Sequence, residues 1–182
     1  MYEVEVKMHL NNREAVIKKL KDLGCIFGEV LHQIDYIFIP EEVSFPPPLD
    51  VPVLRVRKEN EKYFFTMKIS MSNRQDCIEK ELEIFEGEKM LEILKFLKYK
   101  QVPVVDKKRI KTKIREIEVV LDEVVGLGEF LEAEKIVHTH DGEERKKIQE
   151  ELLSFLETLG IKREDQIVNG KYDIMLYEKY EI

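Results

Sequence analysis

Tryptophan is absent from this chain, and cysteine is rare. The two cysteines, Cys25 and Cys77, lie far apart and lack the close spacing of metal ligands, so we interpret them as reduced thiols. The chain has no run of about 18 apolar residues, the length that a membrane-spanning helix needs. Its first ten residues lack the basic start and apolar stretch of a secretory signal. These absences predict a cytoplasmic protein without a membrane anchor.

Net positive charge is also absent. The net charge of -7 argues against broad binding of nucleic acid or of anionic membranes, because both need an extended basic surface. A locally basic pocket is still compatible with this value, since the chain contains 30 Lys and Arg residues. Hydrophobic residues make up 43% of the chain, enough to build the core of one domain over residues 1–182.

Three segments have the apolar spacing of amphipathic helices. The first runs from Arg13 to Leu23, where Asn11 and Glu14 have the spacing of a capping box. The second covers residues 88–99, and the third begins after Asp141. Two polar or proline-rich stretches, 40–52 and 70–76, are predicted to be loops, because proline cannot pair within a central strand. The proline-rich loop is a candidate to close over a site.

Most of the remaining segments alternate charged and apolar residues with a period of two, which predicts strands with one charged face. Charges of one sign gather on individual strands. Glutamates two residues apart occur at 3/5, 81/83, 116/118 and 132/134, and arginines at 55/57. An antiparallel sheet with one solvated face would also alternate in this way, and it remains the main alternative.

Two considerations favour an enclosed charged face over a solvated one. Like charges repel across a sheet, so crowded carboxylates fit a divalent cation and crowded guanidinium groups fit a polyphosphate. The three helices must also bury their apolar stripes, and the apolar strand faces are the only large surface available to them. We therefore predict an α+β fold, with an antiparallel closed or nearly closed β-barrel of about eight strands. This barrel forms a charged tunnel, and the helices pack outside it.

Several charged motifs follow one another in a fixed order along the chain. The chain opens with Glu3-Val4-Glu5-Val6-Lys7, and the further motifs are 54–57, 66–68, 81–83, 107–109, 121–124 and 126–134. In this order the set resembles the CYTH family, the triphosphate tunnel metalloenzymes, over essentially the whole chain. The chain length, the stretch 32–36 and the segment 121–134 are most similar to the class IV adenylate cyclase-like branch. One departure is Lys171, which stands where cyclase-like members have a serine.

The resemblance implies roles for individual residues. Catalytic roles are implied for Glu3, Glu5, Lys7, Lys68 and Arg109. The implied ligands of Mg²⁺ or Mn²⁺ are Glu3, Glu5, Glu132 and Glu134, with Glu83 and Asp122 as helpers. The implied triphosphate-binding residues are Lys7, Arg55, Arg57, Lys68, Lys107 and Arg109, and Lys171 would add a further contact. Without the resemblance, the basic run 107–113 would equally fit a solvated strand or a weak nucleic-acid patch.

Three function classes follow, and all share a triphosphate ligand: ATP, thiamine triphosphate or tripolyphosphate. We favour a divalent-metal-dependent adenylate cyclase that converts ATP to cyclic AMP and pyrophosphate. An inorganic or thiamine triphosphatase is the first alternative, and a module that binds polyphosphate or nucleotide without turnover is the second. The number of acidic positions disfavours the binding module, since an anion alone does not need them. The sequence leaves open whether the chain forms a homodimer.

Overall fold

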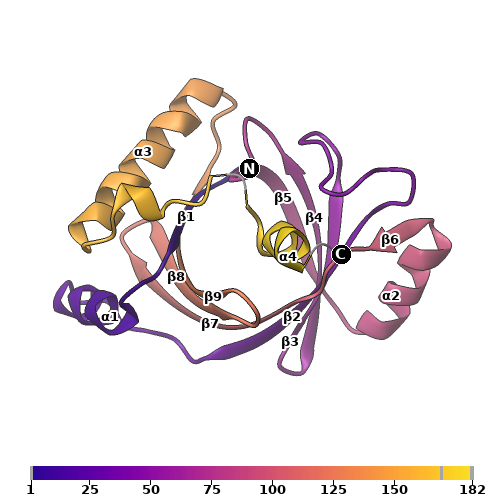
Figure 1. Cartoon of the computed structure of the whole chain (residues 1–182), viewed down its shortest axis with the longest axis horizontal. Helices are drawn as coiled ribbons and strands as arrows, with labels where there is room; N and C mark the ends of the chain where they lie inside the picture. Colours follow the sequence, from indigo (N-terminus) through magenta and orange to yellow (C-terminus); the bar gives the residue numbers. More distant parts are fainter. Residues whose placement is uncertain (1, 169, 181–182) are drawn as a thin grey trace.

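The computed structural model describes residues 2–168 and 170–180. Eight strands form a closed antiparallel barrel, as Figure 1 shows end-on. In chain order they are β1 (Tyr2–His9), β2 (Leu31–Pro40), β3 (Val53–Glu59), β4 (Lys62–Ser70), β5 (Asp76–Ile84), β7 (Val105–Ile114), β8 (Ile117–Val124) and β9 (Gly128–Val137). The predicted α+β barrel is therefore confirmed.

Neighbouring strands follow the order β3-β4-β5-β1-β9-β8-β7-β2, and a direct pairing of β2 with β3 closes the ring. The short strand β6 (Tyr99–Gln101) pairs with the far end of β2 and lies outside the barrel. The pairing of β1 with β5 is the shortest within the barrel and covers only Tyr2 to Val4. From Glu79 to Ile84, β5 pairs with β4 alone, so the ring of strand pairings is interrupted along this part of β5.

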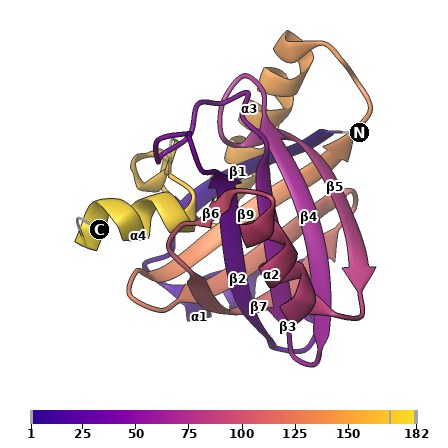
Figure 2. The same ribbon diagram turned by 90° about the vertical axis from the view of Figure 1, so that its right-hand side faces the viewer.

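Three of the described helices cover the outer face of the barrel, and a fourth lines one end of its cavity. The four helices are α1 (Arg13–Asp22), α2 (Gly87–Phe96), α3 (Gly142–Thr158) and α4 (Tyr172–Tyr180), and a 3-10 turn (Arg163–Asp165) precedes α4. The apolar residues of β1, β8 and β9 share one core with α1 and α3, while α2 packs over β3 and β4 on another side (Figure 2). Because side chains on a strand alternate between faces, this outer core turns the charged residues inward.

Two details differ from the sequence-based expectations. Asn12, rather than Asn11, caps α1, and its side chain accepts a hydrogen bond from the backbone N–H of Ala15 at 3.0 Å. The helix α4 was not predicted, because its apolar and polar residues are not separated into two faces. Tyr172 and Leu176 instead become buried against barrel residues, so tertiary packing stabilises this helix. Within residues 2–168 and 170–180, no helix is both long and apolar enough to cross a membrane.

Candidate active site

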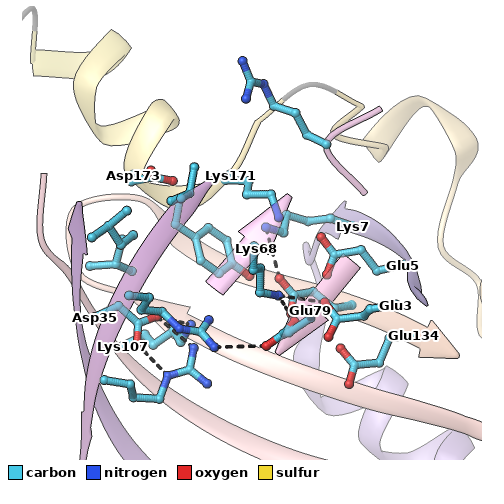
Figure 3. A pocket seen from close by; sticks show the side chains of 18 of the residues that line it. Glu3, Glu5, Lys7, Asp35, Lys68, Glu79, Lys107, Glu134, Lys171 and Asp173 are labelled. Atoms are coloured by element: carbon cyan, nitrogen blue, oxygen red, sulfur yellow. Dashed lines mark hydrogen bonds and ion pairs between the residues drawn. The ribbon is translucent and has the colours of Figure 1, made fainter. Parts of the chain in front are cut away.

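A cavity of about 310 Å³ lies inside the barrel, and every barrel strand contributes side chains to it. The first turn of α4 and the loops at 47 and 74 complete its lining. Eleven of the predicted site residues line this cavity: Glu3, Glu5, Lys7, Arg55, Arg57, Lys68, Lys107, Arg109, Glu132, Glu134 and Lys171. Figure 3 shows acidic and basic side chains from opposite strands directed toward the same space. The predicted inward orientation of these residues is thus what the structure shows.

Glu83 does not join the other acidic residues. It lies outside the cavity, its side chain is 48% exposed, and it forms an ion pair with Lys62 at 3.3 Å. The cause is the short pairing of β1 with β5, after which β5 carries Glu83 away from β1 toward the rim of the barrel. The expectation that Glu83 assists a metal site is therefore corrected.

Asp122 also differs from its expected role beside a metal ion. It is fully buried and does not line the cavity. Its carboxylate accepts hydrogen bonds from Arg109 Nε at 2.7 Å and Nη2 at 2.5 Å, and from the Tyr172 hydroxyl at 3.0 Å. Because both of its oxygens have partners within the protein, Asp122 orients Arg109 instead of contributing to the group of cavity carboxylates.

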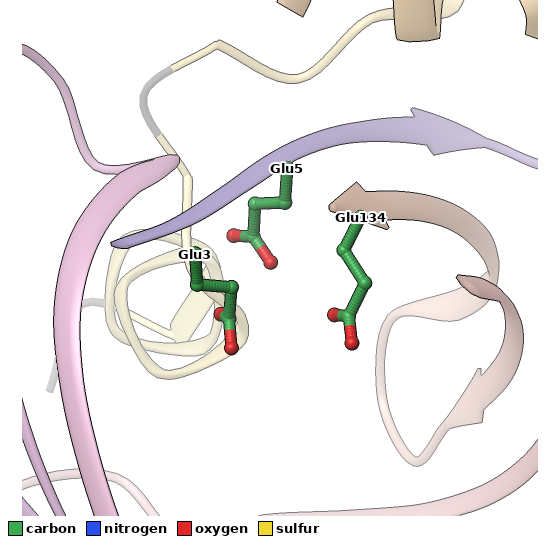
Figure 4. Close-up of side chains that lie close together, drawn as sticks. All are labelled: Glu3, Glu5 and Glu134. Carbon is green, nitrogen blue, oxygen red and sulfur yellow. The ribbon is translucent and has the colours of Figure 1, made fainter. Parts of the chain in front are cut away.

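Three carboxylates approach one another at one side of the cavity. Glu3, Glu5 and Glu134 each place an oxygen atom within 4.8 Å of the other two, and Figure 4 shows their carboxylates converging. Strand register explains the approach, since Glu5 of β1 is directly opposite Glu134 of β9. Burial and the negative charge of Glu3 raise the pKa of Glu134 well above its usual value. We call these three residues the carboxylate cluster.

Lys68 of β4 links the carboxylate cluster to Glu79 of β5. Its ammonium group lies 2.8 Å from Glu3 Oε1 and also forms an ion pair with Glu79. Burial opposes the ionisation of Glu3, but the adjacent Lys68 prevails and lowers the pKa of Glu3 well below its usual value. For Glu79, burial is the larger effect, and the hydrogen bond that it shares with Glu3 adds to it, so the pKa of Glu79 is raised.

A second group of buried charges lies across β1, β9, β8 and β7. Arg109 Nη2 bonds both Asp122 and Glu132, the latter at 2.7 Å, and Lys7 lies 3.1 Å from Glu132 Oε1. Burial opposes the charge on Glu132, but Lys7 and Arg109 lower the pKa of this carboxyl well below its usual value. We call Lys7, Arg109, Asp122 and Glu132 the paired wall. Glu132 thus has two cations as partners, whereas Glu134 on the same strand faces other carboxylates.

A third group is organised around Asp35, a buried residue of β2. Asp35 accepts hydrogen bonds from Arg57 Nε at 2.6 Å and from Lys107 Nζ at 3.0 Å. Burial and the nearby Arg109 lower the pKa of Lys107 to about 7, although the Asp35 carboxylate partly opposes this shift.

Arg55 contacts side chains of β4 and β5. Its Nη2 donates to Thr66 at 3.0 Å and to Glu81 at 3.0 Å. Its Nε is buried and has no hydrogen-bond partner among the described residues. A buried donor without a protein partner beside a charged cavity can be satisfied by a water molecule or by an acceptor atom of a ligand.

Sequence reasoning missed several cavity residues. Asp35 lies in the stretch 32–36 that contributed to the family resemblance, and Glu79 shares the inward face of β5, so a signal existed for both. Tyr172 follows Lys171 in the stretch that was compared with cyclase-like members, but only tertiary packing places the ammonium of Lys7 3.8 Å from the centre of its ring.

Comparison with known proteins assigns the chain to a family. A model of the CYTH domain matches residues 1–170. The chain belongs to the CYTH family. This CYTH protein is 34% identical over 174 residues to a protein of Methanocaldococcus jannaschii that bears the name putative adenylate cyclase. That alignment covers 94% of this chain and 97% of the relative.

Solved structures from Pyrococcus horikoshii OT3 resemble the CYTH chain closely. One protein is 34% identical, with a TM-score of 0.77, and the match covers 96% of this chain and 98% of the other. A second protein is 27% identical, with a TM-score of 0.81, and the match covers 97% and 99% of the two chains. The whole barrel, with its helices, is therefore shared with these proteins.

Proposed function

We propose that this protein is a divalent-metal-dependent enzyme that binds a triphosphate inside the barrel, and that its reaction converts ATP to cyclic AMP and pyrophosphate. The observation that carries the proposal is the presence of two sets of charges within one cavity. Three crowded carboxylates line it together with Arg55, Arg57, Lys107 and Arg109. The cyclase reaction is further supported by the name of the relative from M. jannaschii.

The carboxylate cluster fits a divalent metal ion. Glu3, Glu5 and Glu134 supply only oxygen atoms, the ligands that Mg²⁺ and Mn²⁺ prefer, and their negative charges repel one another without a cation. These three residues would hold the ion. When bound, Mg²⁺ or Mn²⁺ would neutralise phosphate charge and act as a Lewis acid.

The basic residues of the cavity would hold and orient the phosphate chain. Arginine offers paired donors that match phosphate oxygens, and the buried Arg55 Nε is still free to donate among the described residues. Fixed neighbours hold two of the arginines in place, because Asp35 binds Arg57 and Asp122 binds Arg109. This arrangement positions donors before the ligand arrives, which lowers the cost of orienting it.

In the cyclase reaction, the ribose 3′-oxygen attacks the α-phosphorus. A bond forms between these two atoms, the bond from the α-phosphorus to the bridging oxygen breaks, and pyrophosphate leaves with that oxygen. The hydroxyl proton must be taken up by a base. Lys107 would not be this base, because a bound triphosphate favours its protonated form and keeps it as a phosphate-binding cation, so the proton passes to solvent water.

A triphosphatase is the second candidate, and Lys171 favours it. This residue lines the cavity where cyclase-like members have a serine, and it adds a positive charge that a terminal phosphate could use. In this reaction, water attacks the terminal phosphorus of tripolyphosphate or of an organic triphosphate. The metal and phosphate sites would be the same, so the reactions differ in the position of the attacking oxygen.

Product analysis with the full chain tests both candidates. The protein is incubated with ATP or tripolyphosphate and with Mg²⁺ or Mn²⁺, and the products are separated. Cyclic AMP with pyrophosphate supports the cyclase. Orthophosphate alone, or a strong preference for tripolyphosphate, supports the triphosphatase. Binding without turnover under all conditions contradicts both. For the site variants tested in the same assay, Glu123→Gln is the matched control, since Glu123 is exposed on the outside of the same barrel.

A further inference from the structure

The basic residues of the cavity differ in whether a carboxylate neutralises them. Most of them are held in ion pairs, such as Arg57 with Asp35 and Arg109 with Asp122. Among the described residues, Arg74 and Lys171 are the cavity-lining cations without an ion pair to a carboxylate. Neither belongs to a barrel strand: Arg74 comes from the loop between β4 and β5, and Lys171 directly precedes α4.

Arg74 is held in place by a neutral partner. Its Nη2 donates to the backbone carbonyl of Pro47 at 2.8 Å, which links its own loop to the proline-rich loop 41–52. The backbone on either side of Arg74 is fixed, since Asn73 Oδ1 accepts from Gln75 N at 2.8 Å. The Gln75 carbonyl in turn accepts from Glu5 N at 2.9 Å. The loop of Arg74 is therefore tied to β1, the strand that carries Glu3 and Glu5.

Lys171 lies in the same part of the cavity. Its Nζ is 3.5 Å from Cys77 Sγ, and the same thiol lies 3.4 Å from the backbone carbonyl of Arg74. The side chain of Gln75 donates to the carbonyl of Ile167, which brings the two segments together a second time. Figure 3 shows Lys171 directed toward the same space as Lys7 and Lys68.

Paired and unpaired cations respond differently to an arriving anion. The positive charge of a guanidinium in a buried ion pair is largely compensated by the carboxylate. A ligand must then share the guanidinium with that carboxylate. A cation whose partner is a neutral carbonyl keeps its full charge, and it gains a charge-assisted hydrogen bond when a phosphate oxygen replaces the carbonyl. Arg74 and Lys171 therefore each offer a phosphate a positive charge that no ion-paired carboxylate compensates.

We propose that Arg74 and Lys171 form a phosphate-binding subsite at this end of the cavity, in which Arg74 exchanges the Pro47 carbonyl for a ligand oxygen. This inference rests on the proposed binding of a triphosphate and adds Arg74 to the residues that contact it. The same exchange frees the proline-rich loop 41–52 from its contact with Arg74, so binding at the subsite is coupled to that loop.

A purely structural role for Arg74 would be to tie the two loops together. The variant Arg74→Gln separates the roles, because glutamine retains an N–H donor but lacks the charge. Lys171→Gln removes the other charge, and Arg163→Gln is the matched control, since Arg163 is exposed and its partners are Glu150 and Glu157 on the surface. Arg74→Lys retains the charge and provides a second variant should the glutamine variant fold poorly.

The experiment measures the binding of tripolyphosphate to the full chain by titration calorimetry in the presence of Mg²⁺, together with the melting temperature of each variant. We expect Arg74→Gln and Lys171→Gln each to weaken binding about tenfold or more, the size of one lost charge-assisted hydrogen bond, and Arg74→Lys to weaken it less. Arg163→Gln should bind like the unmodified protein.

Two results contradict the proposal in distinguishable ways. If the unmodified protein binds tripolyphosphate and Arg74→Gln binds it equally well, the subsite is wrong while the proposed function stands. A lower melting temperature with unchanged affinity would identify Arg74 as a loop tie only. If the unmodified protein binds neither tripolyphosphate nor ATP, the proposed function itself fails, and the subsite fails with it.

Discussion

The carboxylate cluster and the paired wall are built on neighbouring residues of β9, yet their charges are balanced in opposite ways. Glu132 in the paired wall contacts Lys7 and Arg109, and these cations lower the pKa of its carboxyl. Glu134 lies two residues further along the same face, where burial and Glu3 raise the pKa of its carboxyl. In the same pairing Glu132 is opposite Lys7 of β1 and Glu134 is opposite Glu5, so the residue across the strand separates a satisfied charge from one that needs a cation.

The difference indicates how the two regions contribute. Buried charges that satisfy one another hold side chains in fixed positions, and removing one partner leaves the other uncompensated. Buried charges of like sign destabilise the folded protein until a ligand neutralises them, and binding then stabilises the fold. We therefore expect the paired wall to govern stability and the carboxylate cluster to govern metal binding.

The largest effect on stability is expected from Asp122→Asn in the paired wall. Asparagine leaves the buried guanidinium of Arg109 with less compensating charge, and breaking a buried ion pair costs about 3–5 kcal/mol. Chemical denaturation measures the free energy of unfolding, and Glu123→Gln on the outer face serves as the control. A loss below about 1 kcal/mol would show that the wall does not depend on this pair.

The largest effect on activity is expected from Glu134→Gln in the carboxylate cluster. The variant retains the shape of the side chain but removes the charge of a proposed metal ligand. Because loss of groups behind a metal ligand already costs about 10–100-fold, kcat/KM should fall by about 100-fold or more. Steady-state kinetics at constant metal concentration measures this value, and full activity would exclude Glu134 as a ligand.

Metal binding should also raise the thermal stability of the protein in the absence of substrate. At a concentration about 100 times its Kd, Mg²⁺ or Mn²⁺ should add about 2.7 kcal/mol to the free energy of unfolding. Thermal melting with and without the ion, or after chelation, measures the effect. Glu134→Gln should lose most of this gain while melting no lower than the unmodified protein without metal, because one repulsive charge is gone. An equal gain in both proteins would place the ion elsewhere.

The smallest expected effect is a change in protonation at Lys107. Its pKa of about 7 lies far below the usual value, and a bound triphosphate would raise it by adding negative charge. Binding at pH 7 should therefore take up about half a proton, with more taken up at pH 8 and little below pH 6. Because the complex favours the protonated form, affinity should weaken as pH rises through 7.

Calorimetric titrations in two buffers with different ionisation enthalpies measure this proton uptake. Lys107→Gln should remove it, whereas Lys108→Gln is the control, since Lys108 is exposed on the opposite face of the same strand. Equal proton uptake in the Lys107→Gln variant would assign the titration to another group.

Much of the barrel could be predicted because its evidence is local. A period of two along β1, β3 and β9 indicates which side chains share a face, whichever strand lies next to them. The helix α4 could not be predicted, since its stability comes from burial against the end of the barrel. The position of Glu83 could not be predicted either, because it depends on where the pairing of β5 with β1 ends.

The sequence by itself determined the fold class, the inward-facing charges and the family, because strand periodicity and ordered motifs are properties of neighbouring residues. The tertiary structure decided which charges neutralise each other. Glu132 and Glu134 are both glutamates, and Arg57 and Arg74 are both arginines. Their different partners come from distant strands and loops. Electrostatic energy depends on distance and burial, and both are set only when the chain closes into the barrel.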